Sequence, residues 1–502
     1  MRLGEILVLV SAIGLIVWRF NRADQQRMVN LSFGGLLLAA LIFHLGIEGE
    51  RWQMWPAYAF AAGVLIIGLI GLRRTVDVQS PVWRRGLRIS ISLGLALIAT
   101  ALPVLLPVFV LPAPTGPHAV GVHDFALTDS SREDADAPDP KTKREIMIRA
   151  WYPISDVRNP VVPMLSGKLA AEVSKVFSPI PGVAMMSHLT LIPTHSHLDA
   201  PVLSGTDKLP VVIFSPGLYS FVAQNTSLME ELASNGCVVL SIGHPYTAAA
   251  LEFPDGRVVT KGALPKYKDI DHFIALSKVS MQAPTLKERR NALIEMGNQD
   301  PLRPVLQVWV DDTEFVIDMI DRAQTVTEFA FLNDRMDENR IAVTGMSFGG
   351  ATAAQVCYKD PRCKVGVNLD GSEYANLLGK ALPVPFLMEY DEQNIWKGRG
   401  NNDLFYDDPM NLQSSKVERI ILKGTAHSDM SDATQLALPL LKPYVGLGSD
   451  DGAVIIHVLD TVTPRFINQV LLARPLPANG LLDGVPGVYP QDYRAALADR
   501  VQ

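Results

Sequence analysis

Three uncharged apolar runs within the first 112 residues constrain the fold of this chain more than any other feature of its sequence. They cover residues 29–47, 55–72 and 89–111, and each is near the roughly 20 residues that a helix needs to cross the hydrocarbon core of a bilayer. A shorter run at 6–18 resembles the apolar part of a signal peptide, but no small-residue cleavage site follows it, so we interpret it as a first span. The sequence therefore predicts a transmembrane helical region of three to four spans at residues 1–112.

The arginines of this region predict its orientation. Arg19, Arg22 and Arg27 lie between the first two runs, and Arg73, Arg74, Arg84, Arg85 and Arg88 lie between the last two, whereas the middle loop carries only Arg51. Because basic loops stay on the cytoplasmic side, the chain after residue 111 is expected on the outer side. The same orientation follows if the first run does not span.

The rest of the chain is acidic. Of the 45 basic and 52 acidic side chains, the first 112 residues hold 10 and 5, which leaves 35 and 47 for residues 113–502. An acidic surface repels the phosphate backbone of nucleic acid, so we expect no nucleic-acid partner.

A proline-rich linker at 110–121 leads into strand-like and helix-like segments that alternate. The segments rich in Val and Ile are 145–153, 209–215, 237–243, 340–345, 364–370, 384–390 and 417–424. Amphipathic helical patterns such as 224–236 and 306–324 separate most of them. Continuous apolar strands that alternate with helices predict an α/β domain, with a mainly parallel sheet covered on both faces. We place this domain at 113–450, followed by a C-terminal helix and tail at 451–502.

One cramped turn, Gly345-Met346-Ser347-Phe348-Gly349, stands between a strand-like segment and a helix with a small-residue start. This spacing matches the nucleophile elbow, in which a serine occupies a strained strand-to-helix turn. The flanking glycines permit the close backbone approach that exposes the serine hydroxyl. We therefore predict that Ser347 is a catalytic nucleophile.

A serine nucleophile needs a histidine base and an acid that orients it, and in this arrangement both follow the serine in the chain. Of the two histidines downstream of Ser347, His427 lies in a polar loop after the last predicted strand, while His457 lies in an apolar helical run. We predict His427 as the base. Asp370 and Asp391 each end a predicted strand, and spacing alone leaves the choice of acid open.

Four segments resemble one known family. "LPVVIFSPGLYS", "DENRIAVTGMSFGGATAAQ", "KVGVNLDGSEY" and "ILKGTAHSDMSDAT" are similar, in order, to blocks of the secreted, plasma-type platelet-activating-factor acetylhydrolases and their bacterial esterase relatives. The resemblance runs from about residue 118 to 440 and implies an α/β-hydrolase fold. It also implies a triad of Ser347, Asp370 and His427, because the family takes its acid from the strand directly after the elbow helix. Asp391 becomes the alternative acid.

The resemblance also implies an oxyanion hole, in which backbone N–H groups stabilise the negative oxygen of a tetrahedral intermediate. One donor is the N–H of Phe348, directly after the nucleophile, and the family match places the other at Leu218. Pro216 stands where the family usually has a histidine. Proline has no N–H, but it precedes the donor by two positions, so the oxyanion hole is still expected.

A second motif suggests a different chemistry. His195, His197 and Asp199 in "THSHLDA" resemble the H-x-H-x-D core of zinc-dependent hydrolases, but Ala200 replaces the closing histidine and no second ligand set follows. We interpret the segment as a loop. His244, at a strand end in "IGHPY", is interpreted as structural support for the rim of the site.

The three cysteines predict no disulfide framework. Cys237 lies in an apolar strand-like run, and a bridge between Cys357 and Cys363 remains open.

These patterns together predict a membrane-anchored serine esterase, with an outward-facing catalytic domain, that cleaves carboxylic esters such as short or oxidised acyl groups on phospholipids. Two excursions, 155–207 and 260–303, are expected to cap the site and to form an acyl-binding wall. The expected partners are a small-molecule or lipid ester and the membrane, and no metal or organic cofactor is needed. The alternatives are a lipase or polyester-type esterase with the same triad, and an inactive membrane-anchored ligand sensor.

Overall fold

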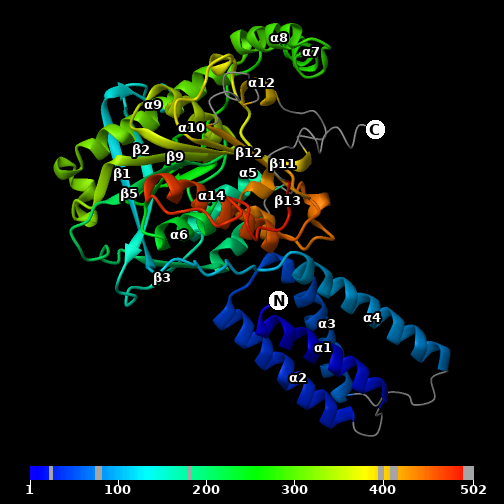
Figure 1. Ribbon diagram of the computed structural model, residues 1–502. Coiled ribbons are helices and arrows are strands. Elements are labelled where there is room, and N and C mark those ends of the chain that lie inside the picture. Colours follow the sequence, from blue (N-terminus) through cyan, green and yellow to red (C-terminus); the bar gives the residue numbers. More distant parts are fainter. Residues whose placement is uncertain (22–25, 74–81, 179–183, 394–400, 407–415, 490–502) are drawn as a thin grey trace.

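The N-terminal region forms a bundle of four helices that lies beside a larger α/β domain (Figure 1). The computed structural model describes residues 1–21, 26–73, 82–178, 184–393, 401–406 and 416–489. The bundle helices are α1 (Leu3–Asn21), α2 (Gln26–Phe43), α3 (Trp55–Arg73) and α4 (Val82–Leu105), and short helices at His44–Glu48 and Trp52–Met54 connect α2 to α3. Small and apolar side chains, among them Ala12, Leu37 and Ala61, fill the space between the helices.

Three stretches of the bundle are long and apolar enough to cross a membrane, namely Asn30–Glu48, Trp52–Ile70 and Gly86–Leu105. The apolar part of α1, Leu3–Val17, is shorter. Outward-facing apolar side chains such as Ile42 and Leu97 are largely exposed. The helix expected over 89–111 ends at Leu105, before a proline at 107 that has no N–H to continue the ladder. Parts of the arginine-rich loops, 22–25 and 74–81, lie outside the described residues.

An eleven-stranded sheet organises the α/β domain, in the order β13-β12-β11-β10-β9-β5-β6-β2-β1-β4-β3. Its strands are β1 (Ala119–Glu133), β2 (Lys143–Ile154), β3 (Val161–Pro163), β4 (Pro193–Leu198), β5 (Leu209–Ser215), β6 (Val238–Gly243), β9 (Met336–Met346), β10 (Cys363–Leu369), β11 (Phe386–Asp391), β12 (Val417–Leu422) and β13 (Val488–Tyr489); β7 (Ala250–Glu252) and β8 (Val258–Thr260) form a separate pair. The six strands from β12 to β6 run parallel.

Helices cover both faces of the sheet, and the strand residues alternate between the two layers. On β5, Val211 and Ile213 contact one core cluster while Val212 and Phe214 contact the other. This is why the strand is apolar throughout. Helices α9 (Leu302–Asp321) and α10 (Phe348–Lys359) cover the first face, and α6 (Thr226–Ser234) and α14 (Gly452–Leu471) cover the second. The remaining helices are α5 (Gly167–Phe177), α7 (Ile270–Gln282), α8 (Leu286–Gln299) and α12 (Asp403–Tyr406).

The edge of the sheet differs from the expectation in two ways. The segment expected as one more parallel strand, β2, pairs antiparallel with both β6 and β1. The motif expected to be a loop, 194–200, contributes most of β4, which pairs with β1. Long-range pairing decides both features, and a local pattern of residues does not report it.

A disulfide joins Cys357 at the end of α10 to Cys363 at the start of β10, so the bridge that the sequence left open is formed. Cys237 is a buried free cysteine.

Candidate active site

Ser347 occupies the turn between β9 and α10 with a left-handed backbone, at φ 56°. A side chain on either neighbouring glycine would prevent this turn. A Cβ on Gly349 would lie 1.9 Å from the carbonyl oxygen of Ser215, and a Cβ on Gly345 would lie 2.3 Å from the backbone of Gly349. Residues in such strained conformations persist only where their surroundings enforce them, and they cluster at functional sites. The elbow inferred from the sequence therefore has the expected backbone.

The structure brings together the serine, the histidine and one of the two acids predicted from the sequence. The Nε2 atom of His427 lies 2.8 Å from the hydroxyl oxygen of Ser347, and its Nδ1 lies 2.6 Å from a carboxylate oxygen of Asp370. Asp370 is almost fully buried, whereas the His427 side chain is 43% exposed. One ring nitrogen thus faces a hydroxyl group and the other a carboxylate, which is the geometry that activation of a nucleophile by an oriented base requires.

The ends of parallel strands supply these groups. Asp370 directly follows β10, and its backbone N–H donates to the Glu389 carbonyl of β11 over 2.8 Å. His427 begins a short helix after β12, and the buried carboxylate of Asp429 anchors that helix by accepting from the Ala426 N–H. The same carboxylate pairs with the fully buried ammonium group of Lys442 at 2.9 Å. A buried, paired charge therefore fixes the loop that presents His427.

Asp391, the alternative acid, ends β11 beside Asp370. Its backbone N–H donates to the other carboxylate oxygen of Asp370 at 3.0 Å. This hydrogen bond helps to hold Asp370 against His427. Ligand atoms of Asp370, Asp391 and His427 also lie within 4.8 Å of one another, which is close enough for a metal ion. Such an ion would compete with the Asp370–His427 hydrogen bond, because it would use the same nitrogen or the same oxygens.

The predicted oxyanion loop is held on both sides of Leu218. The Gly217 N–H donates to the side chain of Gln224 at 2.7 Å, and the Tyr219 N–H donates to the Thr247 carbonyl at 2.8 Å. Gly217 and Leu218 line the same cavity as Ser347. Phe348 is the first residue of α10, where backbone N–H groups have no partner within the helix.

A buried cluster of polar side chains includes His244 and two residues that the sequence did not indicate, Arg144 and Asp312. His244, expected to support the rim, lies 2.9 Å from a carboxylate oxygen of Asp312 and stacks on the ring of Trp309. Asp312 also pairs with the buried guanidinium of Arg144, which holds the pKa of this carboxyl well below its usual range although burial opposes the shift. Trp309 in turn contacts the ring of Phe348. Arg144, His244 and Asp312 come from three distant segments, so no local motif could identify their cluster.

A cavity of about 620 Å³ contains Ser347 and His427. Its lining is mainly apolar, and part of it comes from the first excursion, including Met164, Phe177 and Leu189. No residue of the second excursion, 260–303, is among its described lining residues. Residues 297, 298, 300 and 303 of that excursion line a different cavity. The first excursion therefore agrees with the expected wall, whereas the second does not contribute to it.

The bundle supplies another part of the lining. Trp52 and Gln53, before α3, and Leu106 and Phe109, after α4, all face this cavity. No local pattern indicates this contact, because more than two hundred positions separate the bundle residues from Ser347 in the sequence.

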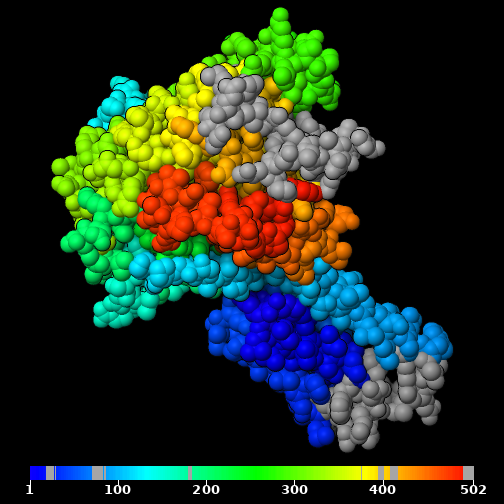
Figure 2. All heavy atoms as spheres, viewed as in Figure 1, coloured from blue at the N-terminus to red at the C-terminus, as the bar shows by residue number. Residues whose placement is uncertain are grey.

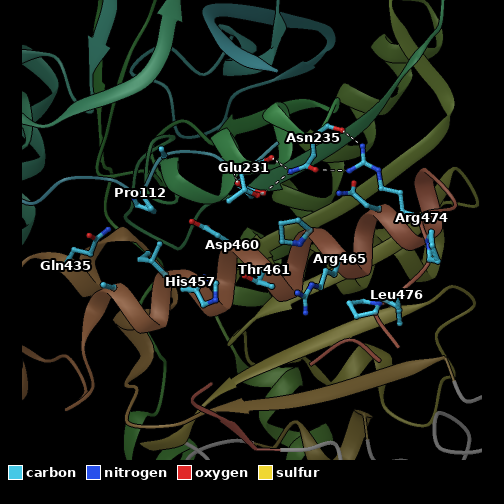
Figure 3. Close-up of a pocket in the computed structure, with 18 of the residues that line it drawn as sticks. Pro112, Glu231, Asn235, Gln435, His457, Asp460, Thr461, Arg465, Arg474 and Leu476 are labelled. Atoms are coloured by element: carbon cyan, nitrogen blue, oxygen red, sulfur yellow. Dashed lines mark hydrogen bonds between the residues drawn. The ribbon is translucent and has the colours of Figure 1, made fainter. Parts of the chain in front are cut away.

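The other histidine motifs lie elsewhere. His195 contacts the carboxylate of Glu230, His197 contacts a backbone carbonyl, and Asp199 contacts His123. The motif residues thus have separate partners and do not converge on one point. His457 lies on α14, where it lines a second cavity of about 570 Å³ whose described lining includes none of the three triad residues (Figure 3).

Residues 107–470 match the model of the family described as platelet-activating factor acetylhydrolase, isoform II. A probable 1-alkyl-2-acetylglycerophosphocholine esterase of Arthroderma benhamiae is 24% identical over 399 residues, which are 70% of this chain and 90% of that protein. A platelet-activating factor acetylhydrolase of Bos taurus is 30% identical over 275 residues, which are 53% of this chain and 58% of that protein.

Among solved structures, a ferulic acid esterase from Streptomyces cinnamoneus superposes with a TM-score of 0.57 at 24% identity, covering 76% of this chain and 99% of that chain. At this identity the likeness shows the fold alone. It confirms the predicted α/β-hydrolase fold of the larger domain.

Proposed function

This chain belongs to the platelet-activating factor acetylhydrolase, isoform II, family and is a carboxylic ester hydrolase, and we propose that it uses Ser347, His427 and Asp370 to cleave short acyl groups from phospholipids. The observation that carries the proposal is the pair of contacts on one imidazole ring, 2.8 Å to the serine hydroxyl and 2.6 Å to the carboxylate. No comparable observation favours the inactive sensor, because the strained elbow and the aligned histidine serve catalysis rather than ligand binding.

In the proposed reaction, the hydroxyl of Ser347 attacks the ester carbonyl while Nε2 of His427 takes its proton. Asp370 keeps the second ring nitrogen protonated and stabilises the imidazolium that forms. The backbone N–H groups of Leu218 and Phe348 stabilise the negative oxygen of the tetrahedral intermediate.

Collapse of the intermediate breaks the bond to the alcohol, which leaves with the proton from His427. An acyl group then remains on Ser347. A water molecule, activated by the same histidine, releases the acyl group as a carboxylic acid and restores the serine.

The substrate class follows from the relatives and from the cavity. The Arthroderma benhamiae relative is a probable esterase of 1-alkyl-2-acetylglycerophosphocholine, which is an acetyl ester of an alkyl glycerophosphocholine. The largely apolar cavity around Ser347 suits a lipid with few polar anchor points. A lipase or polyester-type esterase with the same triad would instead prefer long acyl chains or polymeric esters.

Hydrolysis of phosphatidylcholines that differ only in the length of the acyl group at the second glycerol position separates these functions. We expect kcat/KM of the purified full chain to be highest for acetyl and to fall as the acyl group lengthens. A maximum at long acyl chains would instead identify a lipase.

We also propose that the bundle anchors the chain in a membrane with the α/β domain on the outer side. The three candidate spans support the anchoring. The arginine distribution supports the orientation.

A further inference from the structure

The cavity that holds Ser347 reaches the end of the helix bundle nearest the α/β domain. Two candidate spans have an end there. Trp52 is the first residue of the span Trp52–Ile70, and Leu106 directly follows the span Gly86–Leu105. Figure 2 shows the bundle meeting the α/β domain at this end. If these helices cross a bilayer, the cavity therefore lies at the level of the membrane surface rather than far above it.

An ion pair holds this end of the bundle in place. The buried guanidinium of Arg51 binds both carboxylate oxygens of Glu5 at 2.7 and 2.8 Å. It also donates to the backbone carbonyls of Pro103 at 2.9 Å and Leu106 at 2.5 Å. One side chain thus joins the start of α1, the turn before α3 and the end of α4. Trp52 and Gln53, directly after Arg51, and Leu106 itself line the cavity.

The bundle is also tied directly to the wall of the cavity. The indole N–H of Trp52 donates to the Met185 carbonyl at 2.9 Å, and Nδ1 of His188 lies 2.9 Å from the same oxygen. Met185 and His188 both line the cavity. The first excursion and the bundle therefore form one continuous wall.

Two polar side chains in this wall have unused hydrogen-bonding groups. Gln53 is fully buried, and neither its amide nitrogen nor its amide oxygen has a partner among the described residues. Nε2 of the buried His188 likewise lacks a partner in the part of the chain that the structure describes. Burial lowers the pKa of His188 to about 4, so the ring is neutral, with its proton on Nδ1 and an acceptor at Nε2. Unsatisfied buried groups are costly, so they suit a ligand with polar atoms.

A further part of the cavity wall belongs to an exposed apolar segment, residues 438–447. Tyr444, Val445 and Leu447 line the cavity, yet Tyr444 is 83% exposed and nearby Leu440 is 78% exposed. The Leu438 N–H donates to the carbonyl of Leu105, the last residue of α4. Exposed apolar and tyrosine side chains beside the end of a span fit the surface of a bilayer.

We propose that this enzyme takes its ester substrate directly from the bilayer leaflet that adjoins the catalytic domain, through the side of the cavity that is lined by the end of the bundle and by the segment 438–447. The substrate is a membrane-resident lipid ester. Its long chain stays in the leaflet while its ester group reaches Ser347, and the groups of Gln53 and His188 bind the polar region between the two. The anchor is thus part of the substrate-binding site. The inference rests on the proposed function, since it requires Ser347 to be the nucleophile.

Two fluorophosphonates measure access to Ser347 independently of acyl preference. The full chain is reconstituted in phosphatidylcholine vesicles and labelled either with a hexadecyl fluorophosphonate dissolved in the bilayer or with water-soluble diisopropyl fluorophosphate. The quantity of interest is the ratio of the two labelling rates. Leu106→Trp narrows the side of the cavity that the bundle lines, and Gln53→Met removes the buried amide at nearly constant volume. Leu97→Trp is the matched control. Leu97 belongs to α4, the helix that ends directly before Leu106, but its side chain is 72% exposed and does not line the cavity.

We expect Leu106→Trp and Gln53→Met each to lower the ratio of bilayer to water labelling by about tenfold, and Leu97→Trp to leave it unchanged. If both labelling rates fall equally in Leu106→Trp, that variant is misfolded. The ratio of the two labelling rates in Gln53→Met then tests the inference. A wild-type ratio in Gln53→Met, or an equal fall in Leu97→Trp, would overturn the inference. If the water-soluble reagent fails to label the wild type, the proposed function itself is wrong, so the two failures are distinguishable.

Discussion

Asp370 and Asp391 end neighbouring strands, and their contacts with His427 give them different roles at the scale of single residues. Asp370 reaches the imidazole with its carboxylate, whereas Asp391 contacts Asp370 through its backbone N–H. An orienting carboxylate fixes the tautomer of the histidine and stabilises its charged form. A backbone donor keeps its role when its own side chain is changed.

We therefore expect Asp370→Asn to lower kcat by about 10⁴ and Asp391→Asn to lower it by about tenfold or less. Both substitutions preserve side-chain shape, so each variant is the control for the other. Steady-state hydrolysis of p-nitrophenyl acetate measures the two values. If Asp391→Asn had the larger effect, the acid would belong to the later strand.

The sequence was informative at this scale wherever a local pattern carries the chemistry. The elbow around Ser347 has a fixed spacing because its turn cannot form with other residues at the glycines. The support beneath the site was not predictable, because Asp312 meets His244 and Arg144 only after folding. The sequence pattern of an amphipathic helix does not show which of its carboxylates will be buried.

At the scale of elements, α14 packs on the sheet through a buried carboxyl group. Glu389 of β11 accepts a hydrogen bond of 2.6 Å from Thr463 of α14, and its other oxygen has no partner among the described residues. Burial raises the pKa of Glu389 from 4.5 to about 8. The folded protein thus holds a proton that the unfolded chain releases above about pH 4.5. The stability from this group is present below that pH and is lost as the pH rises toward 8.

We expect Glu389→Gln, which removes this titration but keeps the shape, to stabilise the protein relative to the wild type more at pH 8 than at pH 5. The difference should be on the order of a few kcal/mol in the free energy of unfolding, since one pKa unit corresponds to about 1.4 kcal/mol. Unfolding of both proteins by denaturant in the same detergent measures it. An equal effect of the substitution at both pH values would show that the carboxyl group is not protonated in the fold.

Sequence patterns identified the central strands but not the edge of the sheet. Strands such as β5 are buried on both faces and read as continuous apolar runs. In contrast, β4 contains two histidines, and its pairing with β1 depends on a partner that lies more than seventy residues earlier in the chain. A polar edge strand looks like a loop until its partner is known.

At the scale of the whole molecule, the proposed orientation of the bundle implies on which side of a membrane hydrolysis takes place. The ends of α1, α2, α3 and α4 that adjoin the α/β domain are those opposite the arginine-rich loops (Figure 1). The joint role of bundle and catalytic domain could not be read from the sequence, because Trp52 and Ser347 meet at one cavity only in three dimensions.

Alkaline phosphatase, which is active only outside the cytoplasm, should be active when fused after residue 502. A β-galactosidase fusion at the same position, which is active only inside, should be inactive. Fusions after residue 77, in the loop that we expect to be cytoplasmic, should give the opposite result and serve as the control. Active β-galactosidase at the C-terminus would reverse the proposed orientation.

The most direct test of the account is whether Ser347 is the residue that reacts. Purified full-length protein is treated with a fluorophosphonate, and the labelled residue is identified by mass spectrometry together with the rate of p-nitrophenyl acetate hydrolysis. Ser220→Ala is the control, because Ser220 lines the same cavity. We predict that the wild type and Ser220→Ala are labelled at Ser347, and that Ser347→Ala loses both labelling and hydrolysis while remaining folded. Undiminished labelling of folded Ser347→Ala would contradict the proposed serine mechanism.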